Sequence, residues 1–303
     1  MTDLKITPYD LVRIYKDDVD ITDDLGIAVS GNHSVNRNQE YGTGINTGVS
    51  HPYIREGMAE HNAELSVDSE TFKALELIGE VDSEENELKP SIRLPEFRFE
   101  NQATVKSGDE KIVEIERVKF ASVSMTISAD NPLNFDFSGQ GTKANMKNGL
   151  LDFREEVDDK PVHLQQIKVK IDGSPVELLQ DVTIDFERNL NALSGPDMDY
   201  KRPKELSEGK QQVNINTFSV AITDDLPWNI VWQGKDGDTG EYSLKLQKES
   251  SVLEFELPNG EVLELSGTLF GEVNPDDQDG DDGTREVDIT GNSLSWKVKN
   301  YTE

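Results

Sequence analysis

The amino-acid sequence predicts a mainly β protein with antiparallel sheets, arranged as two tandem β-sandwich or β-barrel domains with one short helix. Apolar and polar residues alternate with a period of two in many segments, and turn motifs separate these segments. A similar order of strands and long polar loops also occurs twice along the 303 residues, which are enough for two domains of ordinary size. We therefore expect a first domain at residues 1–147 and a second at residues 148–303.

The alternation predicts strands with one apolar face, which is typical of antiparallel sheets that are buried on one side only. The clearest alternating sets are Leu133, Phe135 and Phe137; Ile167, Val169 and Ile171; Val182, Ile184 and Phe186; Leu253, Phe255 and Leu257; and Leu294, Trp296 and Val298. Between Ile112 and Ile127 the apolar phase moves from odd to even positions and back again. This shift predicts one long strand that contains β-bulges.

One segment, Ser69 to Gly79, has the pattern of a helix laid against a sheet. Ser69 has the side chain of an N-cap, Phe72, Leu75 and Ile78 form an apolar stripe, and Gly79 is a stop signal. Turns are expected at Asn131–Pro132, Asp172–Gly173, Asp236–Gly237 and Pro258–Asn259–Gly260.

The repeat is visible in the order of strands and loops. A strand at residues 27–35, a polar loop and a strand at 58–67 correspond to a strand at 182–190, a polar loop and a strand at 211–222. A Leu-Pro pair follows in each half, at Leu94–Pro95 and Leu257–Pro258. The alternative is two unrelated β domains with similar turns, because few residues match between the halves.

Charge excludes one class of function and suggests an environment. The chain contains 60 Asp and Glu residues against 30 Lys and Arg, a net charge of -30. A nucleic-acid-binding surface needs a cationic patch, so specific DNA binding is not expected. Acidic residues occur in predicted strands and loops alike, which indicates a surface adapted to high salt, where ions screen the repulsion.

The sequence offers no catalytic or metal-binding motif, so we expect a protein that is not an enzyme. Cysteine is absent, and the four histidines are too far apart for a helical zinc motif. The acidic run from Asn274 to Gly283 fails as a calcium-binding EF-hand loop, because Asp282 stands where glycine is needed. Loose cation binding at Asp277, Asp279 and Asp281 is the remaining expectation there. The N-terminus lacks the pattern of a secretory signal, which predicts a soluble protein made in the cytoplasm.

Three segments, in their order along the chain, resemble the tail tube proteins of long-tailed phages and archaeal viruses. They are YGTGINTGVSHPYIREGMAEHNAELSV at 41–67, VKFASVSMTISADNPLNFDFSGQGTK at 118–143 and VKIDGSPVELLQDVTIDFERNLN at 169–191. The first resembles the long loop of that family, and the other two resemble its paired strands. With the acidic composition, the resemblance points to a virus of a salt-loving host.

The resemblance implies a structural virion protein whose rings stack into a hollow tail tube. Viral DNA would pass through the tube without specific binding, other tail proteins would be partners, and no membrane would be contacted. If the repeat is real, three chains close a ring with pseudo-sixfold symmetry, and if it is not, six chains are needed. The resemblance further implies that a long loop reaches the next ring. The residues expected in that loop are Tyr41, Gly42, Gly44, Pro52, Tyr53, Arg55 and Gly57.

In such a tube, polar strand positions would face the lumen and an acidic wall would repel phosphate. The candidates are Glu114, Glu116, Ser122, Ser124 and Thr126 in the first half, and Thr183, Asp185 and Glu187 in the second. A solvated outer face is the alternative for each of them, because a period of two does not identify the side.

Two other functions remain open from the sequence. A cell-surface or adhesion β-sandwich module would also tolerate acidic loops. A tail-terminator or tail-completion protein would share the fold of the main tube subunit, and one sequence does not distinguish them.

Overall fold

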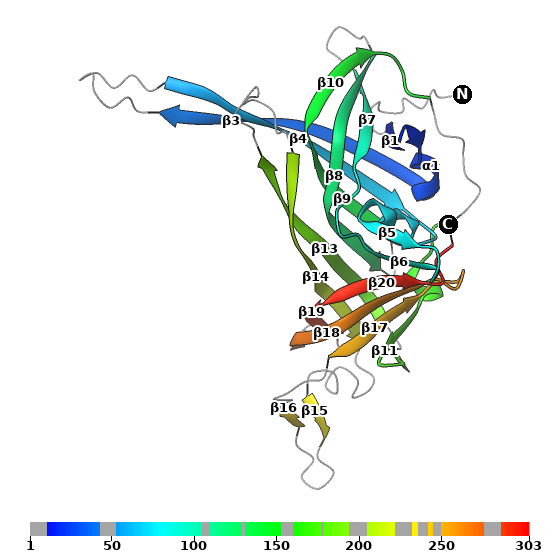
Figure 1. Ribbon diagram of the computed structural model, residues 1–303. Coiled ribbons are helices and arrows are strands. Elements are labelled where there is room, and N and C mark those ends of the chain that lie inside the picture. The colour runs from blue at the N-terminus through cyan, green and yellow to red at the C-terminus, as the bar shows by residue number, and fades with distance from the viewer. Residues whose placement is uncertain are drawn as a thin grey trace, which may run out of the picture.

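The computed structural model describes residues 11–42, 53–104, 110–128, 131–152, 160–176, 179–193, 205–221, 232–235, 242–244, 250–275 and 286–302. The described chain is mainly β, and all of its paired strands are antiparallel, which confirms the predicted fold class (Figure 1). Within the described residues, helical structure is limited to three short segments. These are α1 (Thr22–Leu25) and the 3-10 turns η2 (Lys73–Leu77) and η3 (Leu164–Gln166).

The strands follow one another along the chain with short connections in most places. In the first half they are β1 (Val12–Lys16), β2 (Val19–Asp20), β3 (Ala28–Gly42), β4 (Tyr53–Asp68), β5 (Gly79–Asp82), β6 (Glu87–Pro90), β7 (Phe97–Thr104), β8 (Glu110–Ser128), β9 (Asn134–Gly141) and β10 (Lys143–Asn148). In the second half they are β11 (Lys168–Ile171), β12 (Ser174–Pro175), β13 (Leu179–Leu193), β14 (Glu205–Ala221), β15 (Trp232–Lys235), β16 (Tyr242–Leu244), β17 (Ser251–Glu256), β18 (Val262–Pro275), β19 (Glu286–Ser293) and β20 (Ser295–Lys299).

One large sheet runs through both halves of the chain. Its strand order is β3-β4-β9-β8-β13-β14-β19-β18, and the contact between β8 and β13 joins the first half to the second. We call this eight-stranded structure the main sheet. Its apolar face contributes Val123, Phe135 and Phe186 to the core, each almost fully buried.

Two smaller outer sheets cover the apolar face of the main sheet. The first has the order β2-β1-β7-β8-β10, and the second has the order β12-β11-β17-β18-β20-β6-β5. In the second half, the ring of Phe186 on β13 meets that of Trp296 on β20 edge to face, with 5.5 Å between ring centroids. Such a pair joins the two layers of a β-sandwich.

The long strands β8 and β18 belong to two sheets each. Their N-terminal parts lie in the outer sheets, and their C-terminal parts lie in the main sheet. Each strand crosses over at a residue with a positive φ angle, Arg117 at 54° and Gly267 at 67°. Register shifts follow, between Phe120 and Ser122 and between Phe270 and Glu272. The phase change seen in the sequence of 112–127 is therefore a bulged strand that bends from one layer to the other.

The two halves of the chain have the same strand order. In the main sheet β3-β4-β9-β8 matches β13-β14-β19-β18, and in the outer sheets β2-β1-β7-β8-β10 matches β12-β11-β17-β18-β20. Irregular positions match as well, because β3 has a register shift between Arg37 and Gln39 and β13 has one between Arg188 and Leu190. The Leu-Pro pairs do not match, however. Leu94–Pro95 precedes β7, whereas Leu257–Pro258 follows β17.

The segment expected to be a helix, Ser69 to Gly79, forms a 3-10 turn instead. Its backbone is held by side chains from outside the turn, because a carboxylate oxygen of Glu261 accepts the N–H of Phe72 at 2.9 Å. The Ser69 hydroxyl accepts the N–H of Thr71 at 3.2 Å, and Gly79 already begins β5. Phe72 and Leu75 are fully buried, so tertiary packing determines the conformation of this segment.

Candidate functional site

The surface that the sequence analysis singled out is the solvent-facing side of the main sheet. Directly paired residues form three rows across its strands, and we call these rows the polar face. Listed from β3 towards β18, the first row is Asn32, Glu64, Ser138, Ser122, Glu187 and Gln212; the second is Ser30, Ser66, Asp136, Ser124, Asp185, Asn214, Asn292 and Leu269; the third is Ala28, Asp68, Asn134, Thr126, Thr183 and Thr217.

The polar face is acidic and contains no Lys or Arg in any of its three rows. Five positions are carboxylates, and the rest are hydroxyl or amide side chains except for Ala28 and Leu269. Amides and hydroxyls bind each other along the sheet, as where the Asn134 amide donates to the Ser66 hydroxyl at 3.0 Å. Such a wall offers an anion no cationic partner.

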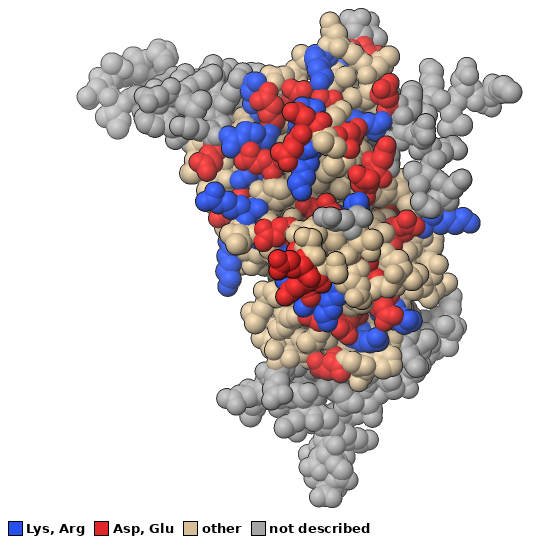
Figure 2. All heavy atoms as spheres, turned by 45° about the vertical axis from the view of Figure 1, so that its right-hand side comes forward, with Lys and Arg blue, Asp and Glu red and all other residues tan. Residues whose placement is uncertain are grey.

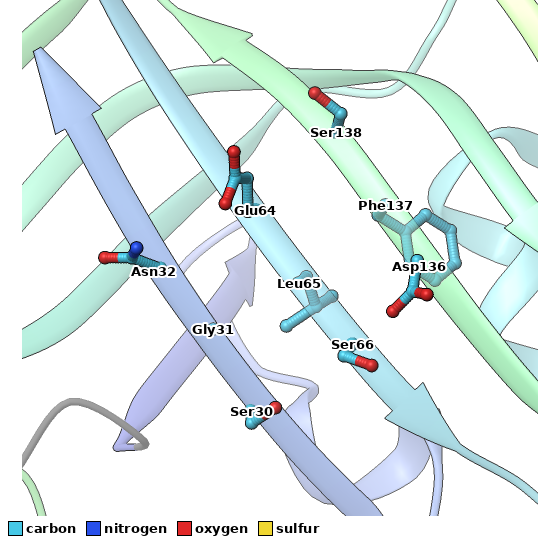
Figure 3. A pocket seen from close by; sticks show the side chains of 9 residues that line it. All are labelled: Ser30, Gly31, Asn32, Glu64, Leu65, Ser66, Asp136, Phe137 and Ser138. Carbon is cyan, nitrogen blue, oxygen red and sulfur yellow. The ribbon is translucent and has the colours of Figure 1, made fainter. Parts of the chain in front are cut away.

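The polar face is hollowed where β3, β4 and β9 meet. A cavity of about 550 Å³ lies there, lined by Asn32, Glu64, Asp136 and Ser138 among others. Figure 3 shows these side chains along three neighbouring strands, with the carboxylates of Glu64 and Asp136 on this side of the sheet. The hollow therefore belongs to the acidic surface.

The structure brings six of the eight lumen-facing candidates together. Ser122, Ser124 and Thr126 on β8 lie directly opposite Glu187, Asp185 and Thr183 on β13. Their neighbours Val123 and Ile184 point into the core and are fully buried. The six residues thus occupy the middle of the polar face, at the junction of the two halves, and the lumen itself stays a prediction.

Glu114 and Glu116 lie elsewhere, on the first outer sheet. They precede the positive-φ residue Arg117, where β8 bends, so they do not share the face of Ser122. Lys143 donates to Glu116 at 2.7 Å, and Lys147 donates to Glu114 at 3.1 Å. Burial raises the pKa of Glu114, but the hydrogen bond and charge of Lys147, together with hydrogen bonds to Glu100 and Asn145, leave the pKa lowered.

The outer sheets differ from the polar face in that carboxylates and lysines lie side by side. In the second half, Lys168 and Lys170 both bind Glu256, at 2.6 and 3.0 Å. Figure 2 shows one face of the molecule on which acidic and basic side chains are interspersed. Within the described residues, the excess of acid is therefore unevenly distributed, and the polar face lacks the cations that the outer sheets have.

A buried group of charges joins the two halves beside the β8–β13 junction. Glu208 on β14 accepts the Lys119 ammonium at 2.6 Å and the backbone N–H of Leu94 at 2.8 Å. Arg188 lies 3.4 Å from Glu208 and donates to the carbonyl oxygens of Ser91 and Ile92. We call Lys119, Arg188 and Glu208 the Glu208 cluster.

The environment of Glu208 favours its charged form. Burial raises the pKa of this carboxyl, but the hydrogen bonds from Lys119 and the Leu94 backbone and the charges of Lys119 and Arg188 together leave the pKa below its ordinary value. The side chains of Lys119 and Glu208 are only 10% and 12% exposed. The ion pair is therefore screened less by solvent than the pairs on the outer sheets.

A second contact between the halves is a strand addition. The β5–β6 hairpin of the first half pairs with β20 of the second half, with Val298 opposite Leu88 (Figure 1). Both of these side chains are fully buried, and Lys297 donates to Glu87 at 2.8 Å beside them.

Among the strand edges without a partner in the described part of the chain are those of β3, of β10 and of the C-terminal part of β18. β3 pairs only with β4, the C-terminal part of β18 pairs only with β19, and β10 pairs only with β8. The β15–β16 hairpin forms a separate two-stranded sheet below the main body in Figure 1. Unpaired edges present free N–H and C=O groups to any further strand.

The expected inter-ring loop is shorter than predicted, because much of it is paired. β3 and β4 form an arm that extends away from the rest of the molecule in Figure 1, and their pairing continues to Gly42 opposite Tyr53. Tyr41, Arg55 and Gly57 are strand residues of this arm. Gly44 and Pro52 lie outside the described residues, and so do Asp277, Asp279 and Asp281 of the candidate cation loop.

Comparison with models of protein families and with curated protein sequences gives no match for this chain. Where the structure describes the chain, it contains no helix that is both long and apolar enough to cross a membrane. The same residues contain no group of three or more side chains placed to hold a metal ion.

The sequence does contain a stronger signal of the repeat than the Leu-Pro pairs. Residues 134–148 (NFDFSGQGTKANMKN) and 286–300 (EVDITGNSLSWKVKN) align without a gap, 286 − 134 = 152 positions apart. These segments form β9 with β10 and β19 with β20. The identical pairs are Asp136 and Asp288, Gly139 and Gly291, Lys147 and Lys299, and Asn148 and Asn300.

Proposed function

We propose that this protein is a self-assembling structural subunit of a tail tube, built from two tandem tube-forming β domains. The observation that carries the proposal is the main sheet, which has the same four-strand order twice, three acidic rows without Lys or Arg and an unpaired strand at each end. The free edges of such a sheet are either paired with further copies, which closes the sheet, or left exposed to solvent.

The β8–β13 junction serves as a template for the contact between copies. Because β18 matches β8 and β3 matches β13, β18 of one copy would pair with β3 of the next in the same way. Such a contact is heterologous and repeats around a closed ring. With three chains, the ring would contain 3 × 8 = 24 strands in one continuous barrel around the polar face.

The register of this contact follows from the matched bulges. Ser124 is opposite Asp185 at the junction within the chain. The bulge after Phe120 on β8 matches the bulge after Phe270 on β18, so Ser124 corresponds to Asn274. The bulge after Arg188 on β13 matches the bulge after Arg37 on β3, so Asp185 corresponds to Ser34. Asn274 of one copy would therefore lie opposite Ser34 of the next.

The polar face suits the inner wall of a tube that conducts DNA. Its five carboxylates repel phosphate, and its hydroxyl and amide groups present no fixed positive charge. A polymer of phosphates would then slide past without binding, which is the property that such a tube requires. No catalytic residue takes part in this function.

The experiment combines negative-stain electron microscopy in molar salt with thiol cross-linking, because the chain contains no cysteine of its own. The variant Ser34→Cys with Asn274→Cys should form rings or hollow tubes, and a short bismaleimide should link chain to chain up to the trimer. Ser124→Cys with Asp185→Cys is the matched control, which should cross-link within one chain.

The proposal is contradicted if the protein stays monomeric at every concentration and the Ser34→Cys, Asn274→Cys variant gives no chain-to-chain product, although the control variant cross-links. A ladder that ends at six chains would replace the trimer by a hexamer. Closed single rings that never stack would point to a terminator or completion protein of the same fold.

A further inference from the structure

We propose that the β15–β16 hairpin of one copy adds to the free edge of β10 in the neighbouring copy and extends its outer sheet. The partner is a second copy of this chain, and the contact is a backbone strand addition between β16 and β10. This inference rests on the proposed function, because it requires copies to meet through the edges of the main sheet.

The first observation is the position of the hairpin in the repeat. β5 and β6 lie between β4 and β7, and β15 and β16 lie between the matching strands β14 and β17. The β5–β6 hairpin pairs with β20, and the strand that matches β20 in the first half is β10. The β15–β16 hairpin therefore lacks, within the described chain, the contact that its counterpart makes.

The second observation is an exposed apolar side chain on β10. In the alignment of residues 134–148 with 286–300, Met146 corresponds to Val298. Val298 lies opposite Leu88 of the paired strand β6 and is 0% exposed, whereas Met146 is 61% exposed. The same position is thus covered in the second half and uncovered in the first, at the edge where a strand is missing.

The third observation is that the hairpin and the main sheet select the same neighbour. Within the chain, the half that supplies β8 to the junction also supplies the β5–β6 hairpin, and the half that supplies β13 also supplies β20. Between neighbouring copies, the second half of one copy would supply β18 to the β3 edge of the next copy. The same half would also supply its β15–β16 hairpin to that next copy. That copy carries the free β10 edge in its first half.

The sequence of β16 fits the role. β16 reads Tyr-Ser-Leu, a sequence with an aromatic and an aliphatic residue to offer a partner strand. β6 places Leu88 at the corresponding contact with β20. An apolar residue from β16 would cover Met146 as Leu88 covers Val298.

The test is cross-linking of assembled protein in molar salt with a short bismaleimide. Met146→Cys is combined with Leu244→Cys on one chain, and Met146→Cys with Tyr242→Cys is a second variant for the other register position. The control is Val19→Cys with Leu244→Cys, because Val19 lies on β2 at the opposite edge of the same outer sheet and is 63% exposed.

We expect the Met146→Cys variants to give a ladder of two and three linked chains. Their yield of linked chains should be at least about tenfold that of the Val19→Cys variant, because paired strands hold the thiols at a high effective concentration. Suppose that rings close through Ser34 and Asn274. The inference about the hairpin is then wrong, and the proposed function stands, if Met146 gives no link, links only within one chain, or links no more strongly than Val19. If no rings form and neither pair links chains, the proposed function fails together with the inference.

Discussion

At the scale of single residues, Glu208 is a largely buried charge that links the two halves of the chain. It accepts hydrogen bonds from Lys119 and from the Leu94 backbone, and it lies beside Arg188. Replacing one member of a buried ion pair leaves the other charge without its partner. We expect Glu208→Gln to lower the free energy of unfolding by roughly 2 to 3 kcal/mol, measured by urea denaturation in molar salt.

Glu256→Gln is the control for this change. Glu256 binds Lys168 and Lys170 on an outer sheet, where solvent screens the pairs, so its loss should leave stability unchanged within error. Equal effects of the two substitutions would contradict the role given to the Glu208 cluster.

The lowered pKa of Glu208 also predicts how this contribution varies with pH. A carboxyl whose pKa is lower in the folded than in the unfolded state stabilises the fold above its unfolded pKa, near 4.3, and loses this effect as pH falls through the folded value. The difference in unfolding free energy between the wild-type protein and Glu208→Gln should therefore be constant from pH 5 to 8. It should shrink below about pH 4.3, and a difference that grew on acidification would contradict the assignment.

At the scale of elements, the matched strands β8 and β18 show that the repeat extends to irregular positions. Gly139 and Gly291 lie opposite Phe120 and Phe270, one on β9 and one on β19. A Cβ atom at Gly139 would be 2.8 Å from the Lys119 carbonyl oxygen, and one at Gly291 would be 2.7 Å from that of Leu269. Backbone approaches each glycine too closely for a side chain.

We expect Gly139→Ala and Gly291→Ala each to lower the free energy of unfolding by about 1 to 3 kcal/mol, because the backbone must shift to admit the methyl group. The effects should add in the double variant, since the two sites lie in different halves. Ser138→Ala, an exposed position on the same strand as Gly139, is the control and should change little. The measurement is thermal unfolding. An unchanged melting temperature with alanine at one glycine would show that the bulge beside it is less constrained than the matching bulge in the other half.

At the scale of the whole molecule, the distribution of charge predicts dependence on salt. The net charge is -30, and the polar face contains carboxylates without cations between them. Lowering monovalent salt from molar to below about 0.1 M extends the Debye length to roughly 10 Å and strengthens this repulsion. We expect the melting temperature to fall over that range, and the fall to be smaller in Asp136→Asn, which removes one charge from the polar face.

Circular dichroism at a series of salt concentrations measures this effect. Glu256→Gln, which removes a carboxylate that already has two lysine partners, should leave the salt dependence as it is. A melting temperature that does not change with salt in the wild-type protein would contradict the interpretation of the acidic surface.

The sequence by itself determined the antiparallel β class and the face of many strands, because a period of two is a local property of the chain. Ser122, Ser124, Thr183 and Asp185 lie on the polar side of the main sheet, as the alternation of their strands indicates. The unpaired edges and the pairing partner of each strand were not predictable in this way. Pairing partners lie far apart along the chain, and no local pattern identifies them.

Tertiary structure alone decided the rest. Glu116 left the face of Ser122 because the backbone turns at the positive φ angle of Arg117 between them. The segment after Ser69 is a 3-10 turn, and Glu261, far along the chain, accepts the N–H group of Phe72 there. Four identities in fifteen residues carry little weight by themselves, and it is the pairing of β9 with β8 and of β19 with β18 that places them at equivalent positions.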